Sequence, residues 1–228
     1  MNHFFRGLGA SFGIVAGYVP VAIAFGVSAL GAGLSPWLAT SVSVLVYAGA
    51  SQFVLVGTLA QGATPLAAAG LALALNLRHL IYGPTLGDKL QGLEHRERAI
   101  LSLGLTDEVF ATTFASPLAG LAPKQRFSWM LGLECGAYLS WVGGTLLGAL
   151  GGTAILALSP MLRPVLEFAL PLLFVLLLEP LVREARGAVA ALIGIAIAAV
   201  LHAADMTSLA LIAAGLGGVA IGLIWKRS

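Results

Sequence analysis

The sequence predicts an all-α integral membrane protein of seven or eight transmembrane helices, built as a 3+3 inverted repeat with broken helices plus C-terminal helices. Three observations lead to this class. The 228 residues are 59% hydrophobic and 10% charged, with a mean hydropathy of +0.97, whereas soluble domains carry about 25% charged residues. Long apolar segments follow one another through short connectors, as membrane-spanning helices do. The first half of the chain also resembles the second.

Eight apolar segments have the length expected of membrane spans, although residues 187–202 are short for a full crossing. Only two connectors are plainly aqueous, at 88–98 and 121–128. We therefore predict one membrane domain over residues 1–228. The predicted spans are about 11–31, 38–60, 64–87, 99–119, 128–151, 165–183, 187–202 and 207–225.

The internal repeat appears when the chain is shifted by 87 residues against itself. Residues 17–36 then align with 104–123, so that Gly33, Leu34 and Pro36 fall on identical residues. We place repeat A at about 11–92, repeat B at about 98–180 and the C-terminal helices at about 187–225. Because each repeat holds three spans, the second copy is inverted, an architecture that recurs in secondary transporters with a midplane substrate site.

Breaks are predicted in the first and fourth spans, at the same depth in both repeats. Gly17 and Pro20 interrupt the first span, since proline lacks a backbone donor and glycine loosens a helix. Thr106, Asp107 and Glu108 interrupt the fourth, and ionisable groups at that depth indicate a functional site. The simpler alternatives are a proline kink in the first span and a structural ion pair between Asp107 and Arg78.

The third span contains "NLRHLIYG" at 76–83, where polar groups spread widely around a helix. Asn76, Arg78 and His79 cannot all face one narrow partner. The helix is therefore either enclosed by protein over a broad arc or unwound near Asn76. The corresponding part of repeat B contains Pro160 and Pro164, which favours an irregular segment in both halves.

Other polar residues in the apolar segments allow two interpretations each. Tyr47, Ser51 and Gln52 stand beside small residues, which fits either ligand approach or helix packing. Glu134 is either a proton site or a hydrogen-bonded structural group. We attribute a glycine-rich face in the fifth span to close helix packing: Gly143, Gly144, Gly148, Gly151 and Gly152.

Several classes of protein are disfavoured. A formal charge of +2 is too small to indicate nucleic-acid binding, and the single Cys135 permits no internal disulfide. The sequence has no P-loop, paired zinc histidines or nucleophile elbow. We therefore predict no enzymatic activity, no cofactor or metal, and no ATPase partner.

Four motifs in order, "GYVPVAIAFG", "YAGASQF", "NLRHLIYG" and "TDEVF", resemble the AzlC family across residues 8–227. The family is the large subunit of bacterial branched-chain amino acid exporters. The resemblance implies a multi-pass inner-membrane permease that acts with a small AzlD-type membrane subunit. It also implies export of valine, leucine, isoleucine and sometimes methionine, driven by the proton gradient, without enzymatic activity.

Roles for these residues follow from the predicted breaks. Backbone amides freed near Gly17–Pro20 would hold the substrate carboxylate, Asp107 would face the ammonium or take the proton, and three phenylalanines would select aliphatic side chains. The predicted substrate-binding residues are Gly17, Tyr18, Pro20, Phe25, Ser51, Gln52, Phe53, Thr106, Asp107 and Phe110. The predicted polar core, for proton coupling or structure, comprises Asn76, Arg78, His79, Asp107, Glu108 and Glu134.

The sequence leaves alternatives open for both the orientation in the membrane and the function. With eight spans, the balance of lysine and arginine favours a cytoplasmic N-terminus, although the 88–98 connector opposes it. The chain could instead carry another small hydrophobic solute, or be a membrane partner subunit that does not transport.

Overall fold

The computed structural model describes residues 2–158 and 185–204. The chain forms two compact units, Met1–Leu170 and Pro171–Ser228, and each is described by itself. Every described element is a helix, as the predicted fold class requires. The sixth predicted span, which is the third span of repeat B, and the eighth predicted span lie outside the described residues.

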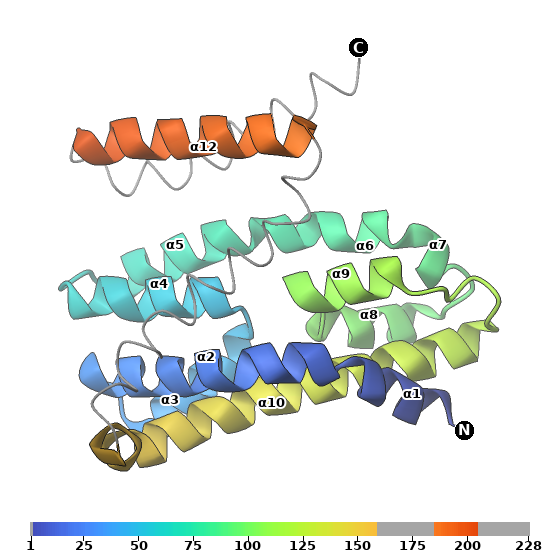
Figure 1. Cartoon of the computed structure of the whole chain (residues 1–228), viewed down its shortest axis with the longest axis horizontal. Helices are drawn as coiled ribbons and strands as arrows, with labels where there is room; N and C mark the ends of the chain where they lie inside the picture. The colour runs from blue at the N-terminus through green and yellow to red at the C-terminus, as the bar shows by residue number, and fades with distance from the viewer. Residues whose placement is uncertain (1, 159–184, 205–228) are drawn as a thin grey trace. The chain divides into compact units, whose positions relative to one another are not determined.

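The first unit is organised around one long helix, α10 (Pro123–Leu158). Helices α1 (His3–Ala10) and α2 (Phe12–Gly31) run along it (Figure 1). A Cβ atom placed on Gly148 would come within 2.2 Å of the Ile23 carbonyl oxygen, and one on Gly144 within 2.7 Å of the Ala22 Cβ. The predicted close packing is therefore confirmed at these glycines, whereas Gly143 faces open space.

The predicted break at Gly17–Pro20 is wrong, because α2 continues through Pro20. Proline in a helix removes one backbone hydrogen bond and crowds the preceding turn. That cost is offset by burial: Tyr18, Val21 and Phe25 belong to the buried face of α2, in a unit where α2 packs along α10. The amides of Gly17–Pro20 belong to a continuous helix, so the carboxylate site predicted there loses its basis.

The second predicted span is interrupted, which the sequence did not indicate. Helix α3 (Pro36–Val46) begins with Pro36 in the first turn and a Ser35 cap, and α4 (Gly49–Ala60) follows after Tyr47–Ala48. Tyr47 has φ 39°, the one positive φ of a non-glycine residue in the described backbone. This left-handed conformation is costly for an aromatic residue and must be held by its surroundings.

The third span loses its regular helix where its polar residues begin. Helix α5 (Pro65–Asn76) is followed by a 3₁₀ helix, η1 (Leu77–Ile81), and by the short helices α6 (Tyr82–Thr85) and α7 (Gly87–Leu90). The predicted unwinding near Asn76 is confirmed. A 3₁₀ segment inside a helix marks local strain or a hinge.

The fourth span breaks at the position predicted for it. Helix α8 (His95–Leu103) ends before Gly104, and α9 (Asp107–Ala115) begins after Thr106, which is extended and caps α9 with its side chain. Asp107 and Glu108 lie in the first turn of α9, where the positive end of the helix dipole stabilises carboxylates.

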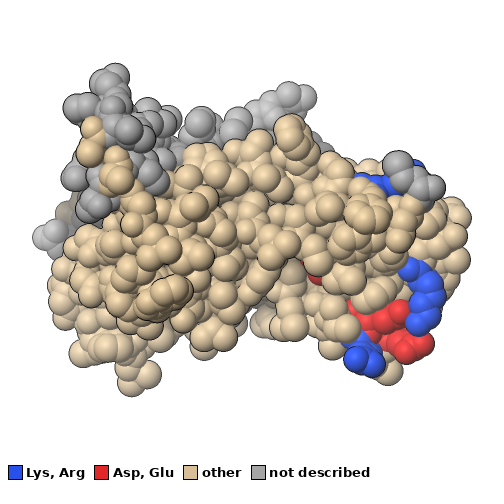
Figure 2. All heavy atoms as spheres, turned by 90° about the horizontal axis from the view of Figure 1, so that it is seen from below, with Lys and Arg blue, Asp and Glu red and all other residues tan. Residues whose placement is uncertain are grey.

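Charged side chains gather at one end of the face shown in Figure 2, and the rest of its described surface carries almost none. Glu94 and Glu97 form a capping box at the start of α8. The Lys124 ammonium donates to both carboxylates, at 3.2 Å and 2.9 Å. This charged cap joins the connector before α8 to the first turn of α10.

We expect Glu97→Gln to lower the unfolding temperature slightly at neutral pH and to have no effect in acid. The Glu94 backbone N–H, and then Lys124, lower the pKa of Glu97 from its ordinary value of 4.5. A lowered carboxyl pKa stabilises the fold above the ordinary pKa, and this contribution is lost as pH falls through the lowered value. Thermal unfolding in detergent, from pH 7 down to pH values below the lowered pKa of Glu97, tests this. A difference between variant and parent that stays constant below about pH 4.5 would contradict it.

Two described helices have the length and hydropathy of a membrane span, Phe12–Gly31 and Pro65–Thr85. Pro36–Val46 and Gly49–Ala60 are shorter apolar helices, each one part of an interrupted span. In the second unit, α12 (Ala185–Ala203) covers the seventh predicted span and contains a shorter apolar stretch, Gly187–Leu201. The total of seven or eight spans, the inverted repeat and the single domain stay predictions.

Candidate substrate site

The amino end of α9 meets α2 through Tyr18. Tyr18 is 3% exposed; its hydroxyl donates to the Glu108 carboxylate and lies at hydrogen-bond distance, 2.8 Å, from Thr106 Oγ1. Thr106 Oγ1 also accepts from the Val109 backbone N–H at 3.4 Å, which completes the cap of α9. Three residues predicted from sequence are therefore brought together: Tyr18, Thr106 and Glu108.

Asp107 faces the unwound third span rather than α2. The Tyr82 hydroxyl donates to the Asp107 carboxylate. The Phe110 ring stacks on Tyr82 with centroids 4.6 Å apart, and His79 meets Tyr82 edge-on at 5.2 Å. The two neighbouring acidic residues of α9 thus bind tyrosines from different parts of the chain.

A buried chain of hydrogen bonds extends from Tyr18 into the fold. Trp141 packs edge-on against Tyr18, with centroids 5.0 Å apart, and its indole N–H donates to Gln52 Oε1 at 2.9 Å. Gln52 donates to Ser43 Oγ at 2.8 Å, which lies 2.7 Å from Thr145 Oγ1. Gln52, Ser43 and Thr145 have no exposed surface, so this chain fixes α3 and α4 against α10.

The two helix interruptions are linked through Tyr47 and Glu134. Gly104, at the α8–α9 break, lies against Glu134: a Cβ atom there would be 2.6 Å from Glu134 Oε2. Tyr47, at the α3–α4 break, packs on Tyr138 with centroids 4.8 Å apart and interacts with Glu108 and Glu134. Glu134 Oε1 is buried without a hydrogen-bond partner among the described residues.

Trp141 was missed by the sequence reasoning, and Tyr47 was singled out there but not assigned to the site. Tyr47 opens the motif "YAGASQF", whose glycine and alanines permit a break, but the surrounding run is apolar. Trp141 lies in the glycine-rich part of α10, and its partner Gln52 is 89 residues away. Only a tertiary contact identifies it.

The remaining predicted residues lie elsewhere in the unit. The Ser51 hydroxyl donates to Asn76 Oδ1, which joins α4 to the end of α5. Phe25 and Phe53 pack together at 5.4 Å, in an apolar cluster of α2, α3, α4 and α10, whereas Phe110 packs on Tyr82 and Phe114. The Arg78 side chain lies outside the described part, so its pairing with Asp107 stays a prediction.

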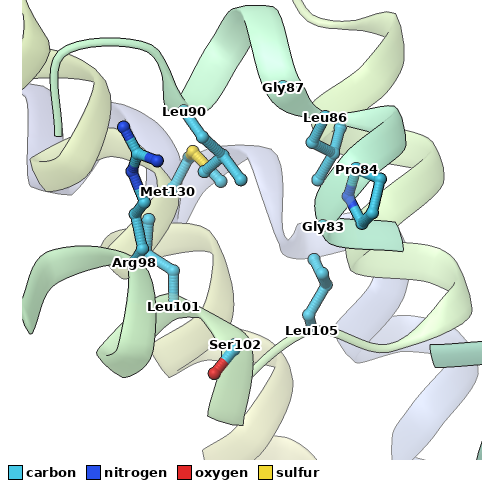
Figure 3. A pocket seen from close by; sticks show the side chains of 10 residues that line it. All are labelled: Gly83, Pro84, Leu86, Gly87, Leu90, Arg98, Leu101, Ser102, Leu105 and Met130. Atoms are coloured by element: carbon cyan, nitrogen blue, oxygen red, sulfur yellow. The ribbon is translucent and has the colours of Figure 1, made fainter. Parts of the chain in front are cut away.

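A cavity of about 420 Å³ lies next to the α8–α9 break (Figure 3). Gly83 and Pro84 from α6 line it, directly after Tyr82, and Leu105 lines it directly before Thr106. Its volume falls within the range of small-molecule sites, about 300–1,000 Å³. Within the part of the chain that the structure describes, no group of three or more histidine, cysteine, aspartate or glutamate residues could hold a metal ion.

Apolar helices, interrupted where buried carboxylates and tyrosines meet, are typical of membrane transport proteins. The family comparison agrees with this class. The model of the AzlC family, described as "AzlC protein", matches residues 13–155. The chain belongs to the AzlC family, and its relatives are membrane proteins.

Relatives are similar over most of the chain. The inner membrane protein YgaZ of Escherichia coli is 36% identical, over 98% of this chain and 92% of that protein. An uncharacterized membrane protein of Archaeoglobus fulgidus is 42% identical, over 94% of this chain and 92% of that one. The branched-chain amino acid transport protein AzlC of Bacillus subtilis is 29% identical, over 62% of this chain and 55% of that protein. No solved structure matches the chain.

Proposed function

We propose that this protein is a secondary transporter that exports branched-chain amino acids across the bacterial inner membrane, coupled to protons. The supporting observation is the cluster of Tyr18, Thr106 and Glu108 at the α8–α9 break. Carboxylates inside an apolar bundle are costly and accompany substrate or proton pathways. The name of the Bacillus subtilis relative, a branched-chain amino acid transport protein, supports this substrate class.

In this proposal the first turn of α9 receives the polar part of the substrate. Asp107 and Glu108 follow the break directly in the sequence, and each is half-buried and hydrogen-bonded by a tyrosine. A carboxylate in this setting attracts the ammonium of an amino acid more strongly than it would in water, because the surroundings screen charge less. Glu134, which is 4% exposed, is the candidate carrier of the coupled proton.

A small AzlD-type subunit is proposed as the partner, on the basis of the family resemblance. All three members of the cluster, Tyr18, Thr106 and Glu108, belong to this chain. We therefore propose that binding needs this chain alone and that transport needs both subunits. Reconstitution with and without the subunit tests this: efflux at the same rate without it would remove the partner from the proposal.

We expect Glu108→Gln to slow efflux of labelled valine from proteoliposomes by about tenfold or more, since a hydrogen bond to a charged group contributes about 1.5–3 kcal/mol. Asp107→Asn should have a similar effect. The matched control is Glu94→Gln, in the charged cap outside the cluster. If both cluster variants keep the efflux rate and pH dependence of the parent, Asp107 and Glu108 have no part in substrate binding or proton coupling.

A ligand test separates transport from the alternative of a partner subunit that does not transport. Isoleucine should raise the unfolding temperature of the purified protein, and serine should not, because a ligand that binds only the folded state stabilises it. If neither amino acid shifts the temperature, the polar cluster only holds the helices together.

A further inference from the structure

The cavity beside the α8–α9 break has apolar walls with well-fixed side chains. Leu86, Leu101 and Met130 are each no more than 2% exposed. In Figure 3 the side chains of Leu86, Leu90 and Met130 point into the cavity. These residues come from three parts of the chain: Leu86 lies between α6 and α7 and Leu90 ends α7, Leu101 belongs to α8, and Met130 belongs to α10. The packed walls give the space a defined shape.

The polar side chains of the lining are Arg98 and Ser102, both from α8. The Arg98 Nε donates to the Leu93 carbonyl at 3.1 Å. Among the described residues, no further hydrogen bond of the guanidinium is found, so its two terminal nitrogens are available to a ligand there. No acidic side chain lines the cavity, and the ion pairs of the described residues do not include Arg98.

We infer that this cavity binds an aliphatic amino acid, with the α-carboxylate on Arg98 and the side chain among the leucines. A guanidinium presents paired donors that match a carboxylate, and the apolar wall favours a branched hydrocarbon over a polar side chain. The inference rests on the proposed function for the choice of an amino acid as occupant. In this inference Arg98 binds the substrate carboxylate. The sequence had predicted that role for the backbone amides of Gly17–Pro20, which lie in the continuous helix α2.

The cavity lies next to the segment that carries the acidic residues of α9. Leu105 lines the cavity and is followed directly by Thr106, Asp107 and Glu108. A zwitterion with its carboxylate at Arg98 would thus lie beside the segment that carries the acidic residues. In this inference the cavity selects aliphatic side chains, a role that the sequence predicted for Phe25, Phe53 and Phe110. Phe25 and Phe53 pack in an apolar cluster instead.

Binding of three ligands with the same branched hydrocarbon to the purified full chain tests which charged group the cavity recognises. Leucine carries both charged groups, 4-methylpentanoate lacks the ammonium, and 3-methylbutylamine lacks the carboxylate. We expect leucine to bind best, 4-methylpentanoate to bind more weakly and 3-methylbutylamine not to bind, as measured by calorimetry in detergent. Binding of the amine without the acid would overturn the inference.

Two variants locate the site. Arg98→Gln should weaken leucine binding by about tenfold or more, through loss of a charged hydrogen bond, whereas Arg96→Gln, on the same helix but outside the lining, should not. Gly83→Leu should narrow the cavity, because Gly83 lines it and no atom lies within 4 Å of a Cβ placed there. It should weaken leucine binding more than alanine binding, whereas Gly57→Leu, also in open space, should change neither.

Valine efflux by the same proteins distinguishes a failure of the cavity assignment from a failure of the proposed transport function. If Arg98→Gln and Gly83→Leu both keep leucine affinity within about twofold of the parent, the cavity is not the site, even if the parent transports valine. If both variants lose binding but the reconstituted parent shows no efflux, the cavity assignment holds and the transport function fails.

Discussion

Gly148→Ala is expected to destabilise the protein by about 2 kcal/mol or more, within or above the range for overpacked cores. The added Cβ would lie 2.2 Å from the Ile23 carbonyl oxygen, and this atom belongs to backbone that cannot rotate away. Helices α2 and α10 would have to separate. Because α2 also carries Tyr18, the contact with Glu108 would shift with it.

The matched control is Gly143→Ala, five residues earlier on α10. No atom lies within 4 Å of a Cβ at Gly143, and alanine is favoured over glycine in a helix by about 0.5–1 kcal/mol. We expect an unchanged or higher unfolding temperature. Thermal unfolding in detergent, followed by tryptophan fluorescence, compares the two. Equal unfolding temperatures would show that α2 and α10 do not approach each other this closely.

Gln52→Leu and Trp141→Phe are each expected to cost about 1–3 kcal/mol, because each leaves a buried polar group without its partner. Gln52 accepts from the Trp141 indole and donates to Ser43, with no exposed surface. The double variant removes both members of the pair, so its cost should be clearly less than the sum. The difference is the coupling free energy, about 0.5–3 kcal/mol for residues in contact.

Gln61→Leu serves as the control for this cycle, because Gln61 is exposed and bonds only the Gly57 carbonyl of its own helix. It should leave stability nearly unchanged and should show no coupling to Trp141→Phe. Chemical or thermal unfolding of the four proteins gives the cycle. Strict additivity between Gln52 and Trp141 would contradict the hydrogen-bonded chain.

Local features of this fold could be predicted from sequence when the residues themselves carry the physical cause. Glycines at helical spacing indicate close packing, and Gly144 and Gly148 provide it. Polar residues in an apolar run indicate irregular backbone, as found after Asn76 and at Thr106. In each case the cost of a polar group in an apolar setting, or the absence of a side chain, decides the local structure.

The same reasoning failed where tertiary packing decides the outcome. Pro20 weakens α2, but burial of the helix keeps it continuous. Tyr47 is a poor residue for a left-handed turn, yet it adopts one where its buried ring packs on Tyr138. The contacts of Gln52 with Trp141, and of Tyr18 with Glu108, join residues about 90 positions apart, beyond the reach of periodicity or motif spacing.

The length of α10 sets which part of the protein stands in water. Its 36 residues extend about 54 Å at 1.5 Å per residue, whereas the hydrocarbon layer is about 30 Å thick. Because the fifth predicted span lies within α10, we expect at least one end of this helix to project beyond the lipid tails. The end with Lys124 suits projection, since its ammonium bridges Glu94 and Glu97. The turn at Gly92 beside it is thus a place where an epitope inserted for topology mapping should be reachable from the aqueous phase.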